Sequence, residues 1–98
     1  MVLHVVLFKP KDDADESAVG ELANVLAALP TKIPGIVDYA WGANVNPEGL
    51  DHGYTHGFVM TFESVDARDA YFPHLDHTAV HPFIDAVTDE VLVFDIER

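Results

Sequence analysis

Apolar side chains gather in four short segments of the chain, and turn residues bound each of them. Residues 2–9 are rich in β-branched and aromatic side chains and end at Pro10, which is typical of a strand. The same pattern predicts strands at residues 36–42, 55–63 and 90–96. Residues 44–53 are polar and contain Gly and Pro, which predicts a loop between the second and third strands.

Between the strands, apolar residues recur at helical spacing. The first stripe extends from the acidic segment 12–16 to Pro30 and consists of Val19, Leu22, Leu26 and Leu29. Ser64 is a predicted N-cap for a second helix that reaches Tyr71 before Pro73 interrupts it. Residues 78–87 predict a further short helix.

The order β-α-β-β-α-β predicts a ferredoxin-like α+β sandwich, with the helices on one side of an antiparallel sheet, formed by residues 1–98 as a single domain. Side chains alternate between the two faces of a strand, and three sets of residues therefore share one face of their strand: Val2, His4, Val6 and Phe8; Val37, Tyr39 and Trp41; His56, Phe58, Met60 and Phe62. The opposite face of the first strand is also apolar. We therefore expect a second sheet to cover it, most economically in a homodimer.

Composition narrows the class of protein. The 98 residues are 49% hydrophobic, which is enough for a packed core. Five basic residues stand against 17 acidic ones, a net charge of −12, and this balance disfavours nucleic acids and anionic membranes as partners. No apolar run approaches the roughly 20 residues that span a bilayer. The absence of cysteine excludes disulfides and thiolate metal sites and fits a cytoplasmic protein.

Histidine and tyrosine are the candidate chemical groups. His56, Tyr71 and His77 lie close together in an apolar part of the sequence. His74, His77 and His81 have the spacing of one helix face, on which imidazoles can bind zinc or nickel. Because prolines sit beside this segment and no Cys or His-Glu-x-x-His motif is present, we expect no metal.

Short segments along nearly the whole chain resemble the stress-responsive A/B barrel family, the dimeric α+β barrel (Dabb) proteins. The similar segments are residues 4–9 (HVVLFK), 34–36 (PGI), 41–42 (WG), 53–56 (GYTH), 61–64 (TFES), 74–77 (HLDH) and 91–95 (VLVFD). The resemblance implies a homodimer whose two sheets form a barrel.

Within that family, the similarity to polyketide cyclases implies site residues. His77 and Tyr71 match the reacting pair, and His4 and His56 match two strand histidines that line the substrate cavity. The family's usual His-Pro-x-His has Leu75 in place of its proline here. The implied roles are a general base for His77 and an oxygen-positioning phenol for Tyr71, with no cofactor.

The sequence leaves three functions open. The first is binding of an apolar or aromatic small molecule in a cavity between sheet and helices, with cofactor-independent cyclisation or isomerisation of a polyketide-like or aromatic compound. The second is a non-catalytic, stress-related structural or binding homodimer, in which the histidines are ordinary core and helix residues. The third is a cofactor-free oxygenase, because other dimeric α/β barrels oxidise quinols in a comparable cavity.

Overall fold

The computed structural model of residues 1–98 contains four strands and five helical segments. The strands are β1 (Val2–Pro10), β2 (Ile36–Ala43), β3 (His56–Phe62) and β4 (Thr88–Glu97). The helices are α1 (Glu16–Ala27), α2 (Leu29–Lys32), α3 (Val65–Tyr71), α4 (Leu75–Thr78) and α5 (His81–Val87). None of these helices is both long and apolar enough to cross a membrane.

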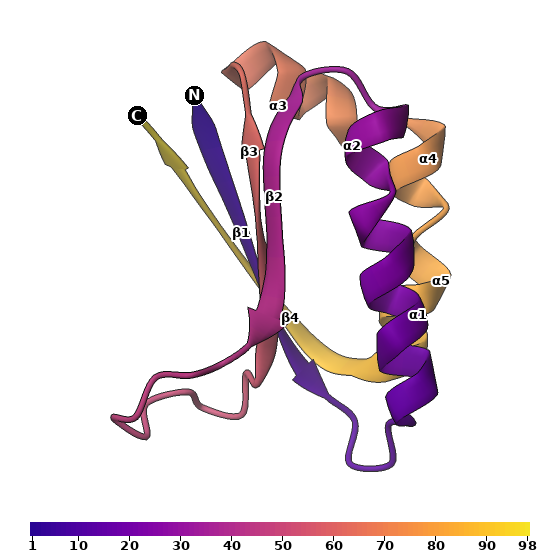
Figure 1. The fold of residues 1–98 in the computed structure, drawn as a ribbon, viewed down its shortest axis with the longest axis vertical. Coiled ribbons are helices and arrows are strands. Elements are labelled where there is room, and N and C mark those ends of the chain that lie inside the picture. The colour runs from indigo at the N-terminus through magenta and orange to yellow at the C-terminus, as the bar shows by residue number, and fades with distance from the viewer.

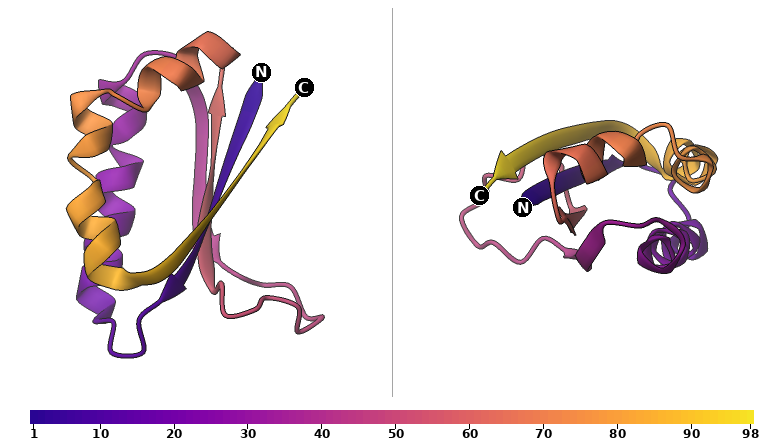
Figure 2. Two further views of the ribbon diagram at one scale, coloured as in Figure 1. Left: turned by 180° about the vertical axis from the view of Figure 1, so that it is seen from behind. Right: turned by 90° about the horizontal axis from the view of Figure 1, so that it is seen from above.

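The strands form one antiparallel sheet in the order β2-β3-β1-β4, which confirms the predicted ferredoxin-like topology. The helices cover one face of this sheet, as Figure 1 shows. Since β1 and β4 are paired neighbours, the two ends of the chain lie side by side (Figures 1 and 2). Two backbone hydrogen bonds join them, from the Met1 ammonium to the Arg98 carbonyl (2.7 Å) and from Arg98 N–H to the Met1 carbonyl (2.8 Å).

Helix boundaries follow local chemistry. The Ser64 side chain accepts a hydrogen bond from Ala67 N–H at 3.1 Å, which confirms the predicted cap of α3. The prediction of one helix as far as Pro30 is wrong, because α1 ends at Ala27 and Pro30 lies in the first turn of α2. Proline has no N–H to donate to a preceding turn, so it starts the short helix. Likewise residues 75–78 form a separate helix, which places His77 inside α4.

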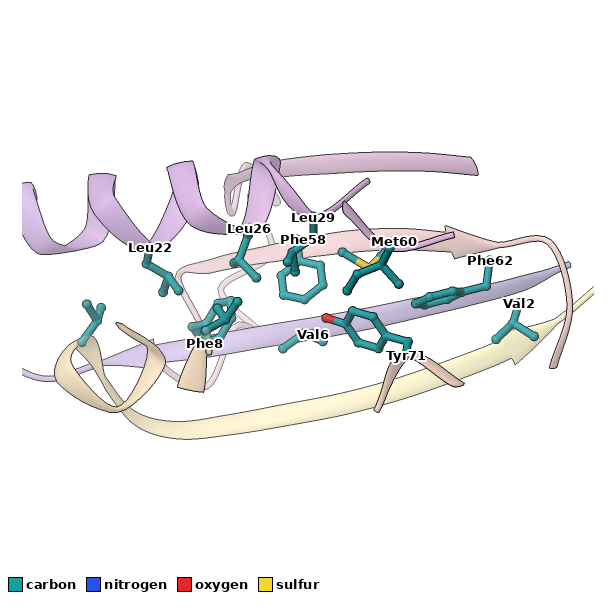
Figure 3. Close-up of a cluster of buried hydrophobic side chains, with 13 residues drawn as sticks. Val2, Val6, Phe8, Leu22, Leu26, Leu29, Phe58, Met60, Phe62 and Tyr71 are labelled. Atoms are coloured by element: carbon teal, nitrogen blue, oxygen red, sulfur yellow. The ribbon is translucent and has the colours of Figure 1, made fainter. Parts of the chain in front are cut away.

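The hydrophobic core lies between the sheet and the helices (Figure 3). Its thirteen buried residues are Val2, Val6, Phe8, Leu22, Leu26, Leu29, Ile33, Phe58, Met60, Phe62, Tyr71, Val80 and Val87. Alternate residues of β1 and β3 supply the sheet side of the core, as their sequence pattern predicts. This packing holds the two strands against α1. The cavity that remains between the sheet and the helices lies beside α4 and α5.

One strand residue departs from the predicted alternation. Val37 was expected to share a face with Tyr39 and Trp41, but the pairing of β2 with β3 shifts between Ile36 and Asp38. Val37 is therefore an extra residue at an irregularity in the strand, and its exposed fraction is 51%. A period of two cannot reveal such an irregularity, because the shift depends on the partner strand.

The turn before β2 packs tightly against α3 at Gly35. This residue has φ of +91°, and a Cβ atom there would lie 2.6 Å from Cβ of Ala67. We expect Gly35→Ala to lower the free energy of unfolding by about 2–4 kcal/mol, because left-handed strain and overpacking each cost about 1–3 kcal/mol. Gly49 has φ of +74° with open space around it, so Gly49→Ala is the control for strain alone. Equal losses for the two variants in urea unfolding would contradict the packing role.

The face of the sheet that points away from the helices is apolar and uncovered. We call it the outer face, and it consists of Leu3, Val5, Leu7, Val59, Leu92, Phe94 and Ile96. Val5 is at its centre, paired with Val59 on one side and Phe94 on the other. The loop between β2 and β3 projects on the same side (Figures 1 and 2). A cavity of about 760 Å³ lies between this loop and the outer face.

Candidate functional site

A second cavity, of about 410 Å³, lies between the sheet and the helices. Eight of its twelve lining residues are hydrophobic, so an occupant would be held mainly by apolar contact. The polar exceptions are His4 from β1, His77 from α4, and His81 and Asp85 from α5. Tyr71, at the end of α3, adds its phenol. The helix-side cavity thus brings together three of the four predicted site residues.

His77 is held in one orientation by the backbone. Its Nδ1 atom lies 2.9 Å from the Phe72 carbonyl oxygen, and because a carbonyl only accepts, Nδ1 carries the hydrogen. The neutral ring therefore has its free lone pair on Nε2. Burial lowers the pKa of His77 below 6.5, with a smaller opposing effect from the Phe72 carbonyl. The neutral, proton-accepting form is favoured near neutral pH.

Tyr71 lies directly against this imidazole. The two ring centroids are 4.1 Å apart at an interplanar angle of 33°, and only 1% of Tyr71 is exposed. Its ring also packs on Phe62 at 5.0 Å. Figure 3 shows the hydroxyl directed into the layer between sheet and helices. Burial raises the pKa of Tyr71 above 10.0, so the phenol remains a hydrogen-bond donor.

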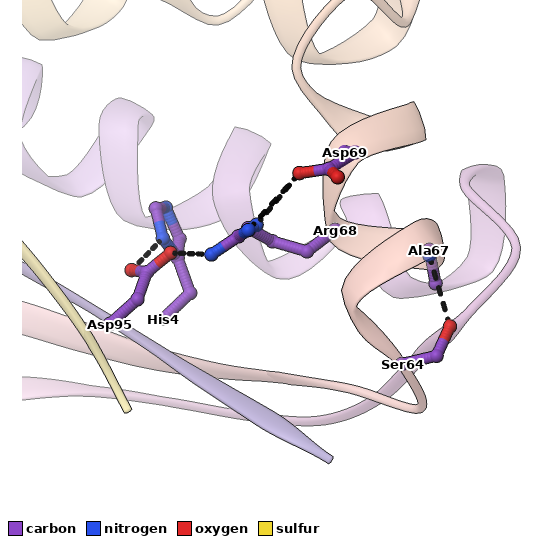
Figure 4. A network of polar contacts seen from close by, with 6 residues as sticks. All are labelled: His4, Ser64, Ala67, Arg68, Asp69 and Asp95. Carbon is purple, nitrogen blue, oxygen red and sulfur yellow. Dashed lines mark hydrogen bonds and ion pairs between the residues drawn. The ribbon is translucent and has the colours of Figure 1, made fainter. Parts of the chain in front are cut away.

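His4 belongs to a charged network at the sheet side of the cavity (Figure 4). Its Nδ1 donates to Oδ1 of Asp95 at 2.7 Å, and Arg68 donates through Nη1 to Oδ2 at 2.8 Å. The hydrogen bond to Asp95 raises the pKa of Arg68. Four aromatic rings surround the buried His4 imidazole at 5.9–6.1 Å, those of Phe58, Phe62, Tyr71 and Phe72. With Nδ1 occupied, Nε2 is the nitrogen left for a ligand.

Asp95 and Arg68 were not among the predicted site residues. Asp95 lies directly opposite His4 in the β1–β4 pairing. The sequence could have singled out Asp95, because it is a charged residue inside an otherwise apolar strand, where a charged or polar partner is expected. Arg68 carried no such signal, since it reaches Asp95 from α3 only in the folded chain.

Asp95→Ala is expected to lower the free energy of unfolding by about 1–3 kcal/mol, because it leaves the buried Nδ1–H of His4 without a partner. Asp69 offers a matched control: it also accepts from Arg68, at 3.1 Å, but its side chain is 59% exposed. Asp69→Ala should change stability by less than about 0.5 kcal/mol. Thermal or urea unfolding of both variants checks this, and similar values would argue against a structural role of the His4–Asp95 pair.

His56 does not join the helix-side cavity. It pairs with Phe8, whereas His4 pairs with Met60, so four strand positions separate the histidines, or about 13 Å. The expectation that they meet over one cavity is therefore wrong, because antiparallel register places them toward opposite ends of the sheet. His56 is half-buried beside Trp41 and lines the cavity under the β2–β3 loop.

The other histidines have separate positions. His74 is the N-cap of α4 and accepts a hydrogen bond from Asp76 N–H at 3.1 Å. His81 is exposed, and its ring lies edge-on to His77 with 4.9 Å between centroids. No group of three or more His, Cys, Asp or Glu side chains is arranged to hold a metal ion. His74, His77 and His81 therefore do not form a three-ligand set.

Comparisons with known proteins all point to one family. The family described as Stress responsive A/B Barrel Domain matches residues 2–98. Olivetolic acid cyclase of Cannabis sativa is 31% identical over 96% of this chain and 93% of its own length. The stress-response A/B barrel domain-containing protein HS1 of Arabidopsis thaliana is 36% identical over 96% of this chain and 86% of its own length.

Solved structures agree with the fold. A dimeric ferredoxin-like protein of unknown function from Jannaschia is 28% identical and superposes with a TM-score of 0.88, covering 99% of this chain and 98% of that one. The sequence match spans nearly every residue of the sheet and helices described above. The chain belongs to the stress-responsive A/B barrel (Dabb) domain family.

Proposed function

We propose that this protein is a cytosolic homodimer that binds an apolar or aromatic small molecule in the helix-side cavity and catalyses cofactor-independent cyclisation or isomerisation of a polyketide-like compound. One observation carries the proposal: His77, oriented by the Phe72 carbonyl, lies against the buried phenol of Tyr71 in an apolar cavity. The similarity to a protein named olivetolic acid cyclase supports cyclisation as the reaction.

The chemistry starts at an acidic C–H between two carbonyl groups of the ligand. Nε2 of His77 takes this proton, and the electron pair of the C–H bond becomes an enolate. The Nδ1–H bond to the Phe72 carbonyl stabilises the imidazolium that forms. Tyr71, protonated because burial raises its pKa, donates a hydrogen bond to the enolate oxygen.

Ring closure then needs the enolate carbon to reach a second carbonyl of the same ligand. A new C–C bond forms, and the oxygen of the attacked carbonyl becomes an alkoxide. The alkoxide takes a proton from solvent, which replaces the proton that His77 removed from carbon. Folding the ligand so that these carbons approach is a matter of positioning, which the cavity walls and the aromatic rings around His4 supply. We assign His4 to ligand orientation through Nε2, since Asp95 occupies Nδ1.

The cavity volume and the net charge of the protein limit the size and charge of the ligand. Its volume of about 410 Å³ fits an aromatic ring with a short chain, within the range of about 300–1,000 Å³ common for ligand sites. The protein's net charge of −12 disfavours a multiply charged anion. A neutral compound with alternating carbonyl groups meets both conditions.

The direct test uses a neutral aromatic β-keto ester in deuterated buffer, with binding measured by calorimetry and loss of the α-hydrogen followed by NMR. Exchange above the buffer background supports proton abstraction. Binding without exchange would instead favour the non-catalytic binding homodimer, in keeping with relatives named only as stress-response proteins. Oxygen consumption with an aromatic substrate would favour the cofactor-free oxygenase.

A further inference from the structure

Three rings form a path from the core to the surface beside the helix-side cavity. Tyr71 is 1% exposed, His77 is half-buried, and His81 is exposed. Centroid distances are 4.1 Å from Tyr71 to His77 and 4.9 Å from His77 to His81, and the two imidazoles are nearly perpendicular at 87°. The proposed reaction uses the first two rings and leaves His81 without a role.

A base in an apolar cavity must release the proton that it gains. Nδ1 of His77 is bonded to the Phe72 carbonyl and one face of the ring is against Tyr71, so release occurs from Nε2. A ligand bound in the cavity would cover the direct route from Nε2 to solvent through the cavity. Apart from Tyr71, the other titratable groups that line this cavity are His4, His81 and Asp85.

These three groups are not equivalent as proton acceptors. His4 is 5% exposed and its Nδ1 is held by Asp95, so a proton passed to its Nε2 would stay inside the protein. Asp85 is exposed, one helical turn beyond His81 on α5. Only His81 both contacts the His77 ring and reaches solvent. An exposed imidazole exchanges protons with buffer at neutral pH.

We propose that His81 is a relay residue that carries protons between His77 and solvent. The inference rests on the proposed function, because it needs a proton to be taken up by His77. The N–H bond at Nε2 of the His77 imidazolium breaks, and the proton passes to a ring nitrogen of His81, directly or through one water. His77 returns to its neutral form, and His81 releases the proton to buffer.

The test is the buffer dependence of deuterium exchange into the β-keto ester. We expect His81→Gln to lower the protein-catalysed exchange rate about tenfold in dilute buffer, less than the ~10²–10⁴ that a direct general base supplies. Added imidazole should restore the rate, because a diffusing base replaces the relay. The matched control is His52→Gln, an exposed histidine of the β2–β3 loop, which should behave as the unsubstituted protein.

The possible results distinguish failure of the His81 relay from failure of proton abstraction by His77. Exchange by His81→Gln at the unsubstituted rate in dilute buffer overturns the relay and leaves proton abstraction by His77 in place. A lower rate that imidazole does not restore also overturns it, since that pattern indicates altered structure. Absence of exchange in the unsubstituted protein overturns the proposed function and the relay together.

Discussion

Replacement of His77 by glutamine is expected to lower the rate of deuterium exchange into the β-keto ester by about 10²–10⁴-fold, the usual contribution of a general base. Glutamine keeps a side-chain N–H for the Phe72 carbonyl, so the local structure around α4 should persist. NMR measures the exchange rate, and circular dichroism and the unfolding temperature show whether the fold is intact. An unchanged rate in a folded His77→Gln protein would remove His77 from the mechanism.

The pH dependence of the exchange rate in the unsubstituted protein is a second test of His77 as the base. Burial lowers the pKa of His77, so the ring stays neutral to a lower pH than a free imidazole. Exchange should therefore fall on acidification with a midpoint below pH 6.5. Around pH 6.5 and just below it, the unfolded chain binds more protons at His77 than the folded chain does. The contribution of His77 to the free energy of unfolding therefore rises with pH in this range. A midpoint above 6.5 would point to another base.

Placing a carboxylate at the centre of the outer face, as Val5→Asp, is expected to abolish the proposed homodimer. Val5 lies between Val59 and Phe94, and Phe94 is 58% exposed in the single chain. An uncompensated buried charge costs about 3–5 kcal/mol. That cost raises the dissociation constant of the dimer by about 10²–10⁴-fold.

The control for this substitution is Leu75→Asp, the same kind of change at an 82% exposed residue of α4 in the helix layer. Analytical ultracentrifugation should show a monomer for Val5→Asp and a dimer for Leu75→Asp. A dimeric Val5→Asp protein would show that the outer face is not the interface. A monomeric unsubstituted protein would exclude the homodimer itself.

The sheet was predictable because its strands carry an unusually complete apolar pattern. Two-faced strands such as β1 indicated both the helix layer and an uncovered outer face, and Ser64 marked the start of α3. The break between α1 and α2 was not predicted, because the stripe through Leu26 and Leu29 continues across it. Spacing along the sequence records which residues face the core but not where the backbone changes direction.

Only the part of the site that is formed by residues close in sequence was predictable. Tyr71 and His77 are close in sequence, so local structure can bring them together. The His4–Asp95 contact joins residues 91 positions apart, and the distance between His4 and His56 depends on register. Strand register is a property of the assembled sheet, so composition and periodicity do not determine it.

Because the two termini are hydrogen-bonded neighbours, the same strand arrangement can be built from a chain that starts at another residue. Met1 and Arg98 bond to each other at the end of the β1–β4 ladder, so a short linker would turn the backbone into a continuous circuit. New ends can then be opened at an exposed turn, an arrangement known as circular permutation. Such a permuted chain would keep every strand neighbour of the sheet while changing the order in which the strands leave the ribosome.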